Sequence, residues 1–288
     1  MSDKKEVDDI SGVETTGHEW DGIKELNNPL PRWWLWTFYG CIAWALVYVV
    51  LYPAIPLING ATPGVLGYSS RGELAKDVAA AAEAKSGSVS QIENMDVADI
   101  FKDDDLTRFA VQGGKSAYKV YCSQCHGAGA EGASGFPNLN DDDWLWGGTV
   151  EDIYATIAHG VRYEADDDTR ASEMPAFGEI LETAEIRATA DFVASLSGLE
   201  HDETQVETGK VVYEENCAAC HGDTGEGIRE LGAPKLNDAL WLYGGTVEQI
   251  ATQIALPKHG MMPAWQARLG DATVKQLAVY VHSLGGGE

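Results

Sequence analysis

Two short segments of the sequence repeat cysteine and histidine at the same spacing. Residues 121–127 read YCSQCHG and residues 216–222 read NCAACHG, so Cys-x-x-Cys-His occurs twice. Two thiols at this spacing can form thioethers to the two vinyl groups of a haem, and the histidine that follows lies on the same helical face, where it can reach the iron. The pattern predicts two haems c, bound covalently by Cys122, Cys125, Cys217 and Cys220, with His126 and His221 as axial iron ligands.

Cys-x-x-Cys alone would also suit a redox dithiol or half of a zinc site. The histidine directly after each pair argues against both. The chain has one further cysteine, Cys41, which lies in an apolar run, and its other histidines do not recur as a Cys/His set, so a zinc site lacks ligands. We interpret Cys41 as a packing residue. His159 and His259 are interpreted as loop or surface residues, and a role for His259 as an alternative ligand stays open.

A histidine-bound iron without a sixth ligand is open to oxygen and peroxide. Both repeats carry Met-Pro-Ala, in EMPAFG from Glu173 and in MMPAWQ from Met261. Methionine more often fills a core, but here the position recurs while its neighbours vary. We predict Met174 and Met262 as the sixth ligands, with Met261 as the competitor. His/Met ligation fills both axial positions and raises the potential, which indicates electron transfer.

The repeat extends well beyond the cysteine motifs. Residues 137–157, PNLNDDDWLWGGTVEDIYATI, correspond to residues 234–254, PKLNDALWLYGGTVEQIATQI. Pro137 and Pro234 follow each histidine, and their carbonyls are candidate acceptors for its second ring nitrogen; the alternative is that these prolines only shape the loop. Each repeat ends in an apolar period typical of a helix. We therefore expect two small helical domains.

Residues 33–52 are twenty residues without a charged side chain, WWLWTFYGCIAWALVYVVLY. At about 1.5 Å per residue, such a helix spans roughly 30 Å of hydrocarbon. Aromatic residues near both ends suit the two membrane interfaces. A buried soluble helix would need apolar protein on every side, and a signal peptide has a shorter apolar core behind a basic leader. We predict a transmembrane anchor over residues 29–57.

The anchor is flanked by polar segments. Residues 1–28 are acidic and aperiodic, which predicts a mostly disordered tail. Ser70 and Glu73 have the spacing of a capping box, so we expect a helix from there through the alanines near residue 80, ended by KSGSVSQ. Residues 58–105 are then a tether that contains this helix. The fold class is mainly α, with domains at 106–200 and 201–288.

The formal net charge is -25, from 45 acidic and 20 basic side chains. Such a surface excludes nucleic acid as a partner and favours cationic partners or a salt-rich environment. The acidic runs at residues 141–143 and 166–168 have two interpretations that both stay open. They either steer a basic protein towards the haems or are simply solvated faces.

Each repeat resembles a class I cytochrome c domain. The whole chain from about Asn27, with NNPLPRWWLWTFYGCIAWALVYVVLYPAIPL, GVLGYSSR and two haem motifs, resembles the dihaem CcoP/FixP subunit (subunit III) of cbb(3)-type cytochrome c oxidases. The resemblance implies a non-catalytic electron-transfer subunit of the bacterial inner membrane. It implies a single pass with a cytoplasmic N-terminus and periplasmic haem domains. Its partners would be a periplasmic donor cytochrome c and the monohaem and haem-copper subunits of the oxidase.

Two other functions remain open at this point. A free membrane-tethered dihaem shuttle, or the acceptor subunit of a dehydrogenase, would share the two haem domains but not need this membrane segment. A dihaem peroxidase would need an open iron site, which two Met-Pro loops disfavour. The first repeat has a longer stretch between His159 and Met174 than the second has between His259 and Met262. We therefore expect different docking faces, with the donor at Asp223, Glu226 and Glu230 of the second domain.

Overall fold

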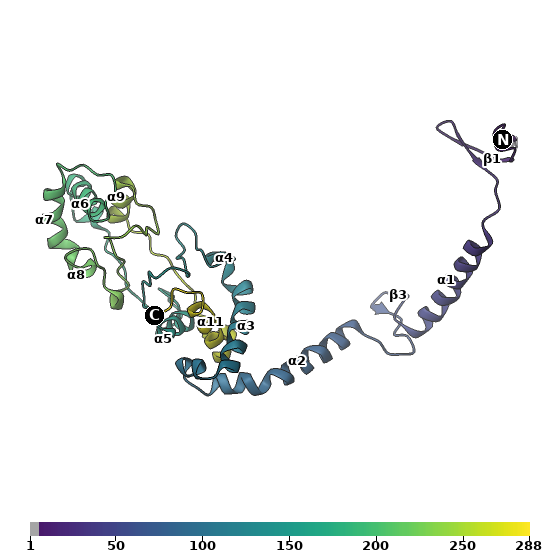
Figure 1. The fold of residues 1–288 in the computed structure, drawn as a ribbon, viewed down its shortest axis with the longest axis horizontal. Helices are drawn as coiled ribbons and strands as arrows, with labels where there is room; N and C mark the ends of the chain where they lie inside the picture. Colours follow the sequence, from purple (N-terminus) through teal and green to yellow (C-terminus); the bar gives the residue numbers. More distant parts are fainter. Residues whose placement is uncertain (1–5) are drawn as a thin grey trace. The chain divides into compact units, whose positions relative to one another are not determined.

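The computed structural model describes residues 6–288 of the chain. The chain divides into two compact units, one reaching to Glu83 and the other running from Ala84 to Glu288. Most of the regular structure is helical, and the strands of the described residues pair as two short hairpins (Figure 1). This agrees with the mainly α fold expected from the sequence.

The first unit contains a hairpin where a disordered tail was expected. Strand β1 (Thr15–Trp20) pairs antiparallel with β2 (Ile23–Leu26). The turn between them is Asp21-Gly22, and both residues have positive φ, 49° and 84°. Asp-Gly between two strands is a strong local signal for such a turn, and the sequence interpretation missed it. Residues 1–5 of the expected tail lie outside the described residues.

Helix α1 (Arg32–Leu51) follows Pro31, whose fixed φ suits the start of a helix, and ends where Tyr52 turns to extended backbone. None of its residues is buried. Within the described residues it is the one helix long and apolar enough to cross a membrane. Strands β3 (Pro56–Leu57) and β4 (Gly60–Ala61) form a small hairpin after it.

Helix α2 (Ser70–Glu93) is longer than the sequence predicted, because residues 85–91 continue it instead of ending it. Its first turn is capped by Ser69, whose hydroxyl accepts from the amide of Gly72 at 3.2 Å, one residue earlier than expected. Its last turn is fixed by tertiary contacts, which override the low helix propensity of Ser and Gly there. Ile92 is fully buried. The ammonium of Lys275 donates to the carbonyls of Ile92, Glu93 and Met95 over 2.8–3.3 Å.

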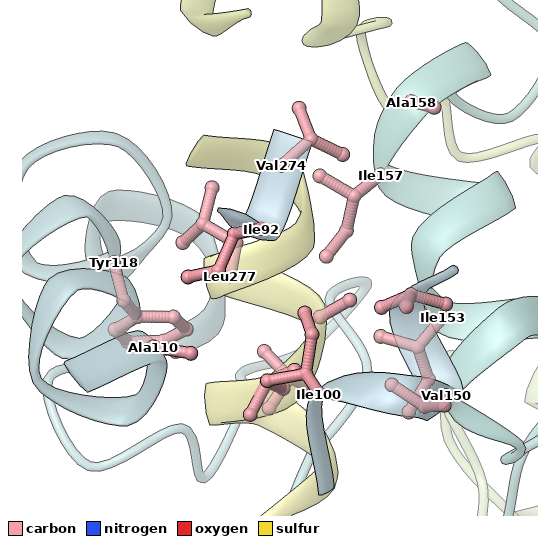
Figure 2. Close-up of a cluster of buried hydrophobic side chains, with 14 of the residues drawn as sticks. Ile92, Ile100, Ala110, Tyr118, Val150, Ile153, Ile157, Ala158, Val274 and Leu277 are labelled. Carbon is pink, nitrogen blue, oxygen red and sulfur yellow. The ribbon is translucent and has the colours of Figure 1, made fainter. Parts of the chain in front are cut away.

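The first core is built from α3 (Asp104–Tyr121), α5 (Val150–His159), the 3-10 turn η1 (Val97–Lys102) and α11 (Asp271–His282). Figure 2 shows side chains of α11 packed between those of the other elements. The end of the expected tether is thus part of this core. The buried side chains include Ile92, Val97, Ile100, Tyr118, Ile153, Ile157, Val274 and Leu277.

The second core is built from α6 (Thr183–Leu196), α7 (Val206–Asn216), α9 (Val247–Ala255) and the turn η2 (Phe177–Glu179). Figure 1 shows α6 beside α7 and α9, and α11 beside α3. Each core therefore takes its closing helix from the other repeat. The remaining short helices are α4 (Ser123–His126), α8 (Ala218–His221), η3 (Arg229–Leu231) and α10 (Gln266–Leu269).

The two repeats can exchange helices because α11 packs on α3 in the same way as α6 packs on α7. A Cβ at Gly114 would lie 2.1 Å from the carbonyl oxygen of Gln276 on α11, and a Cβ at Gly209 would lie 1.9 Å from that of Ala188 on α6. Both crossings need a glycine for the close approach. Residues 197–205 join α6 to α7, and a short connector favours packing of these neighbours at low entropy cost.

Two segments of the chain connect the cores, and they are hydrogen-bonded to each other where they cross. The amide of Val161 donates to the carbonyl of Met262 over 2.9 Å, and the amide of Met262 donates back over 3.0 Å. Gly160 has φ 73°, and a Cβ there would lie 2.3 Å from the carbonyl oxygen of Met262. The domains at 106–200 and 201–288 stay a prediction. These ranges describe the sequence repeats, whereas the folded cores exchange α6 and α11.

Candidate haem sites

The cysteines and the histidine of each motif lie on one tight turn at the end of a longer helix. In the first motif, after α3, the amides of Cys125 and His126 both donate to the carbonyl of Cys122, over 3.1 and 3.0 Å. In the second, the amide of His221 donates to the carbonyl of Cys217 over 3.0 Å. Both turns present two thiols and an imidazole within one turn of helix, as attachment to one haem requires.

Each imidazole is oriented by a proline carbonyl. Nδ1 of His126 donates to the carbonyl of Pro137 over 3.1 Å, and Nδ1 of His221 donates to that of Pro234, also over 3.1 Å. Burial lowers the pKa of both histidines, against a smaller raising effect of these hydrogen bonds. The neutral ring with its proton on Nδ1 leaves Nε2 free to bind iron.

Glycines shape the loops that bring these carbonyls to the rings. Gly132 and Gly227 have φ of 71° and 75°. A Cβ at Gly132 would lie 2.7 Å from the carbonyl carbon of Pro137, and one at Gly227 would lie 2.9 Å from that of Pro234. The sequence interpretation did not identify these glycines. Their signal was available, since each follows its histidine by six residues in both repeats.

Tyrosines hold the end of each motif turn. The buried Tyr118 donates its hydroxyl to the carbonyl of Gly127 over 3.0 Å, and Tyr213 donates to that of Gly222 over 2.7 Å. Burial raises the pKa of both phenols, so they stay protonated and keep donating. These contacts fix the backbone directly after each candidate ligand histidine.

The cysteine thiols of the described residues are all free. Burial, with a smaller effect of the second thiol of the pair, raises the pKa of Cys122 and of Cys217 to about 11. These thiols are therefore protonated at neutral pH. Within residues 6–288, the one group of His, Cys, Asp or Glu with metal-binding geometry contains no cysteine; it consists of His159, Asp166 and Asp168.

Each candidate methionine packs on the core that carries the haem motif of the other repeat. Met262 packs against the core that carries the Cys122 motif, and Met174 against the core that carries the Cys217 motif. In each core, therefore, the candidate methionine comes from one repeat and the candidate ligand histidine from the other. The pairing of Val161 with Met262 places the second Met-Pro-Ala loop beside the end of α5 in the first core. Met261 is 60% exposed, so it packs on neither core.

One buried hydrogen-bond donor has no partner within the described residues and is free to bind a haem. The indole Nε1 of Trp241 is buried and has no hydrogen-bond partner in the described part of the protein. A buried N–H without an acceptor is costly, and a haem propionate is an acceptor of the right chemistry. The equivalent Trp144 instead donates to the carbonyl of Gly286. The buried side chains and the motif turns thus fit haem.

The two histidines interpreted as loop residues lie at the crossing. Nδ1 of His159 is 3.2 Å from a carboxylate oxygen of Asp166. Nε2 of His259 donates to the carbonyl of Met174 over 3.1 Å. His259 therefore uses one ring nitrogen on the backbone of a candidate ligand rather than on an iron.

These features define a class: a c-type cytochrome with tandem haem motifs and an apolar helix ahead of them. The comparisons give the family. The sequence matches the profile of the N-terminal domain of cytochrome oxidase-cbb3, FixP, over residues 12–59, and that of cytochrome C oxidase, cbb3-type, subunit III, over residues 109–193 and 204–281. The chain belongs to the FixP/CcoP subunit family of cbb3-type cytochrome c oxidases.

Full-length relatives agree with this membership. The chain is 56% identical, over 100% of both sequences, to the cbb3-type cytochrome c oxidase subunit FixP of Sinorhizobium medicae. It is 49% identical, over 95% of both, to the subunit CcoP of Cereibacter sphaeroides, and 52% identical, over 99% of both, to that of Azospirillum brasilense. The chain is accordingly a haem-binding cytochrome c of respiratory electron transport, and α1 fits a membrane anchor.

Proposed function

We propose that this chain is the dihaem electron-entry subunit of a cbb3-type oxidase. It takes electrons from a periplasmic donor cytochrome and passes them through a monohaem subunit to the haem-copper subunit. The observation that carries this is the pair of complete motif turns, each with two thiols and a histidine oriented by a proline carbonyl. The match of residues 12–59 to the oxidase family favours this function over a free shuttle or a dehydrogenase acceptor.

The exchanged cores lead us to pair the iron ligands across the repeats. His126 and Met262 would hold the first iron, and His221 and Met174 the second, because each methionine packs on the core of the other repeat's motif. Bound haem supplies a reversible one-electron change at iron. The protein would contribute one histidine and one methionine to each iron, and filling both positions in this way would exclude oxygen and peroxide and raise the potential. The carbonyls of Pro137 and Pro234 keep the histidine rings in place.

The same proposal orients the chain in the membrane. Covalent c haems are attached outside the bacterial cytoplasm, so residues from about 58 onwards would lie in the periplasm. The residues before α1 would then lie in the cytoplasm, with a single pass through the inner membrane. The basic residues near the ends of the helix are too few to decide the orientation themselves.

Purification from detergent-solubilised membranes tests the function. An affinity tag on this chain is expected to bring down a copper-containing oxygen reductase. The mass of the tagged chain is expected to exceed that of the polypeptide by two haems, because both attachment motifs are complete. Recovery of the chain without an oxygen reductase would support the free shuttle, and a mass with one haem or none would contradict the dihaem assignment.

The donor site is expected in the second repeat, at exposed acids beside its haem motif. Of the three candidates, Glu226 accepts from the amide and the hydroxyl of Thr224 over 2.9 Å, so it shapes its own loop. Asp223 and Glu230 are exposed and suit docking. Neutralising both, by Asp223→Asn and Glu230→Gln, should slow reduction by a basic cytochrome c at low salt by about two- to fivefold, since exposed pairs are worth about 0 to 1 kcal/mol.

The matched control neutralises two exposed acids of the first repeat, by Asp167→Asn and Asp168→Asn. Reduction rates are measured by stopped flow over a range of ionic strength, and the slope against salt should flatten only in the first variant. A larger loss of rate in the Asp167 and Asp168 variant would move the donor site to the first repeat.

A further inference from the structure

The two Met-Pro-Ala loops meet at one side chain, that of Arg162. Its Nε donates to the carbonyl of Gly260 over 2.7 Å, and its Nη1 donates to the carbonyl of Ser172 over 2.8 Å. Gly260 lies two residues before Met262, and Ser172 lies two residues before Met174. One guanidinium therefore holds the equivalent backbone position in both methionine loops.

The backbone of Arg162 is fixed in an unusual conformation. Its φ is 51°, in the left-handed region that residues with a Cβ seldom adopt. Its amide donates to the carbonyl of Arg170 over 2.8 Å, and the neighbouring Val161 is paired in both directions with Met262. Strain of this kind persists only where the surroundings determine it, and it concentrates at functional positions.

The guanidinium of Arg162 binds backbone carbonyls rather than a carboxylate. Arg162 is partly buried, and within the described residues no carboxylate lies at ion-pair distance from it. Burial lowers its pKa, yet arginine remains charged, so both hydrogen bonds are charge-assisted. A planar fork can serve two carbonyls at once, which the single ammonium of lysine cannot do with the same geometry.

We propose that Arg162 is a shared positioning residue, a clasp that sets both methionine loops at their irons and so couples the two haem sites. This rests on the proposed function, because it assumes that Met174 and Met262 are the axial ligands. The clasp consists of Arg162 with the carbonyls of Gly260 and Ser172. Since one side chain holds both loops, its loss weakens methionine ligation at both sites together, although it contacts neither sulfur.

The test uses the full-length protein with both haems in detergent. Arg162→Asn removes the guanidinium but keeps a residue that tolerates positive φ, so it isolates the hydrogen bonds from the backbone. Arg162→Lys keeps the charge and removes the fork. The exposed Arg108, which pairs with Asp105 on α3, gives the matched control Arg108→Asn. Covalent haem content and helical circular dichroism check that each variant folds.

The readouts are the near-red sulfur-to-iron charge-transfer band of the oxidised protein and carbon monoxide binding by the reduced protein. Each Arg162 change is made in three backgrounds: unaltered, Met174→Leu and Met262→Leu. Each leucine background leaves one methionine-ligated haem to observe, so the two sites are read separately. The leucine changes alone test the ligand assignment, since each should remove about half of the band when arginine stands at position 162.

With Arg162→Asn, the band should weaken in both leucine backgrounds, and the equilibrium for carbon monoxide replacing methionine should shift by about tenfold or more at both sites, as expected for losing a charge-assisted hydrogen bond. Arg162→Lys should cause a smaller loss at both sites, and Arg108→Asn none. An effect of Arg162→Asn at one site only, or at neither, would overturn the clasp while leaving the ligand assignment intact.

Discussion

A variant with Met262→Leu is expected to lose methionine ligation at the haem attached to Cys122 and Cys125, and to keep it at the other haem. Met262 packs against the core that carries the first motif, although it belongs to the second repeat. Leucine fills similar volume but cannot ligate iron. The affected site should drop in potential by on the order of 0.1 V, since the axial ligands set the potential over a wide range, and it should bind carbon monoxide.

The measurement needs the two haems separated. Replacing Cys217 and Cys220 by alanine leaves only the first haem, which can then be titrated on its own by potentiometry and carbon monoxide difference spectra. In that background Met262→Leu should change the first haem, and Met174→Leu should leave its potential and reactivity nearly unchanged. The opposite result would show that each repeat ligates its own iron and that the exchanged pairing is incorrect.

Most of the candidate haem site could be predicted from the sequence, because its residues lie close together along the chain. Cys122, Cys125 and His126 share one turn, so their spacing alone predicts that they bind one haem. The candidate role of the Pro137 carbonyl was also accessible, since a histidine bound to metal through one nitrogen needs an acceptor for the other. The structure supplies that contact at 3.1 Å. The glycines that let the loop approach the ring, such as Gly132, were missed although their spacing from the histidine recurs, because spacing alone does not show which glycine needs a positive φ.

The exchange of α6 and α11 between the cores could not be predicted from the sequence, and the reason is physical. Two repeats with equivalent apolar faces offer two ways to close the cores, and both bury the same kinds of side chain. The sequence pattern is identical for either choice. The decision rests on the connector between α6 and α7, the residues around Gly160, and the hydrogen bonds of Val161 with Met262, none of which has a periodic signature.

The errors outside the cores have local causes. The hairpin of the first unit follows from Asp21-Gly22, a turn signal outweighed in the sequence interpretation by the acidic composition around it. Helix α2 continues through residues 85–91 because its end is held by the buried Ile92 and by Lys275, whose contact with α2 spans about 180 residues of sequence. Propensity predicts a break there, and tertiary packing overrides it.

The second large effect concerns the exchanged helices themselves. Leu277 on α11 is fully buried in the first core, among side chains of α3 and α5. Replacing it by alanine should lower the free energy of unfolding of that core by about 2 to 5 kcal/mol, from lost burial and the cavity left behind. Although Leu277 lies in the second repeat, the loss of stability should fall on the first repeat's helices.

Hydrogen exchange read by mass spectrometry locates the loss. In Leu277→Ala, peptides from α3 and α5 should exchange faster, while those from α7 and α9 should stay close to the parent protein. The matched variant is Val193→Ala on α6, a helix of the first repeat whose buried face packs in the second core. Its smaller cavity should speed exchange in α7 and α9 instead. Faster exchange confined to the helices of each variant's own repeat would mean that the cores are not exchanged, because a cavity destabilises first the helices that pack around it.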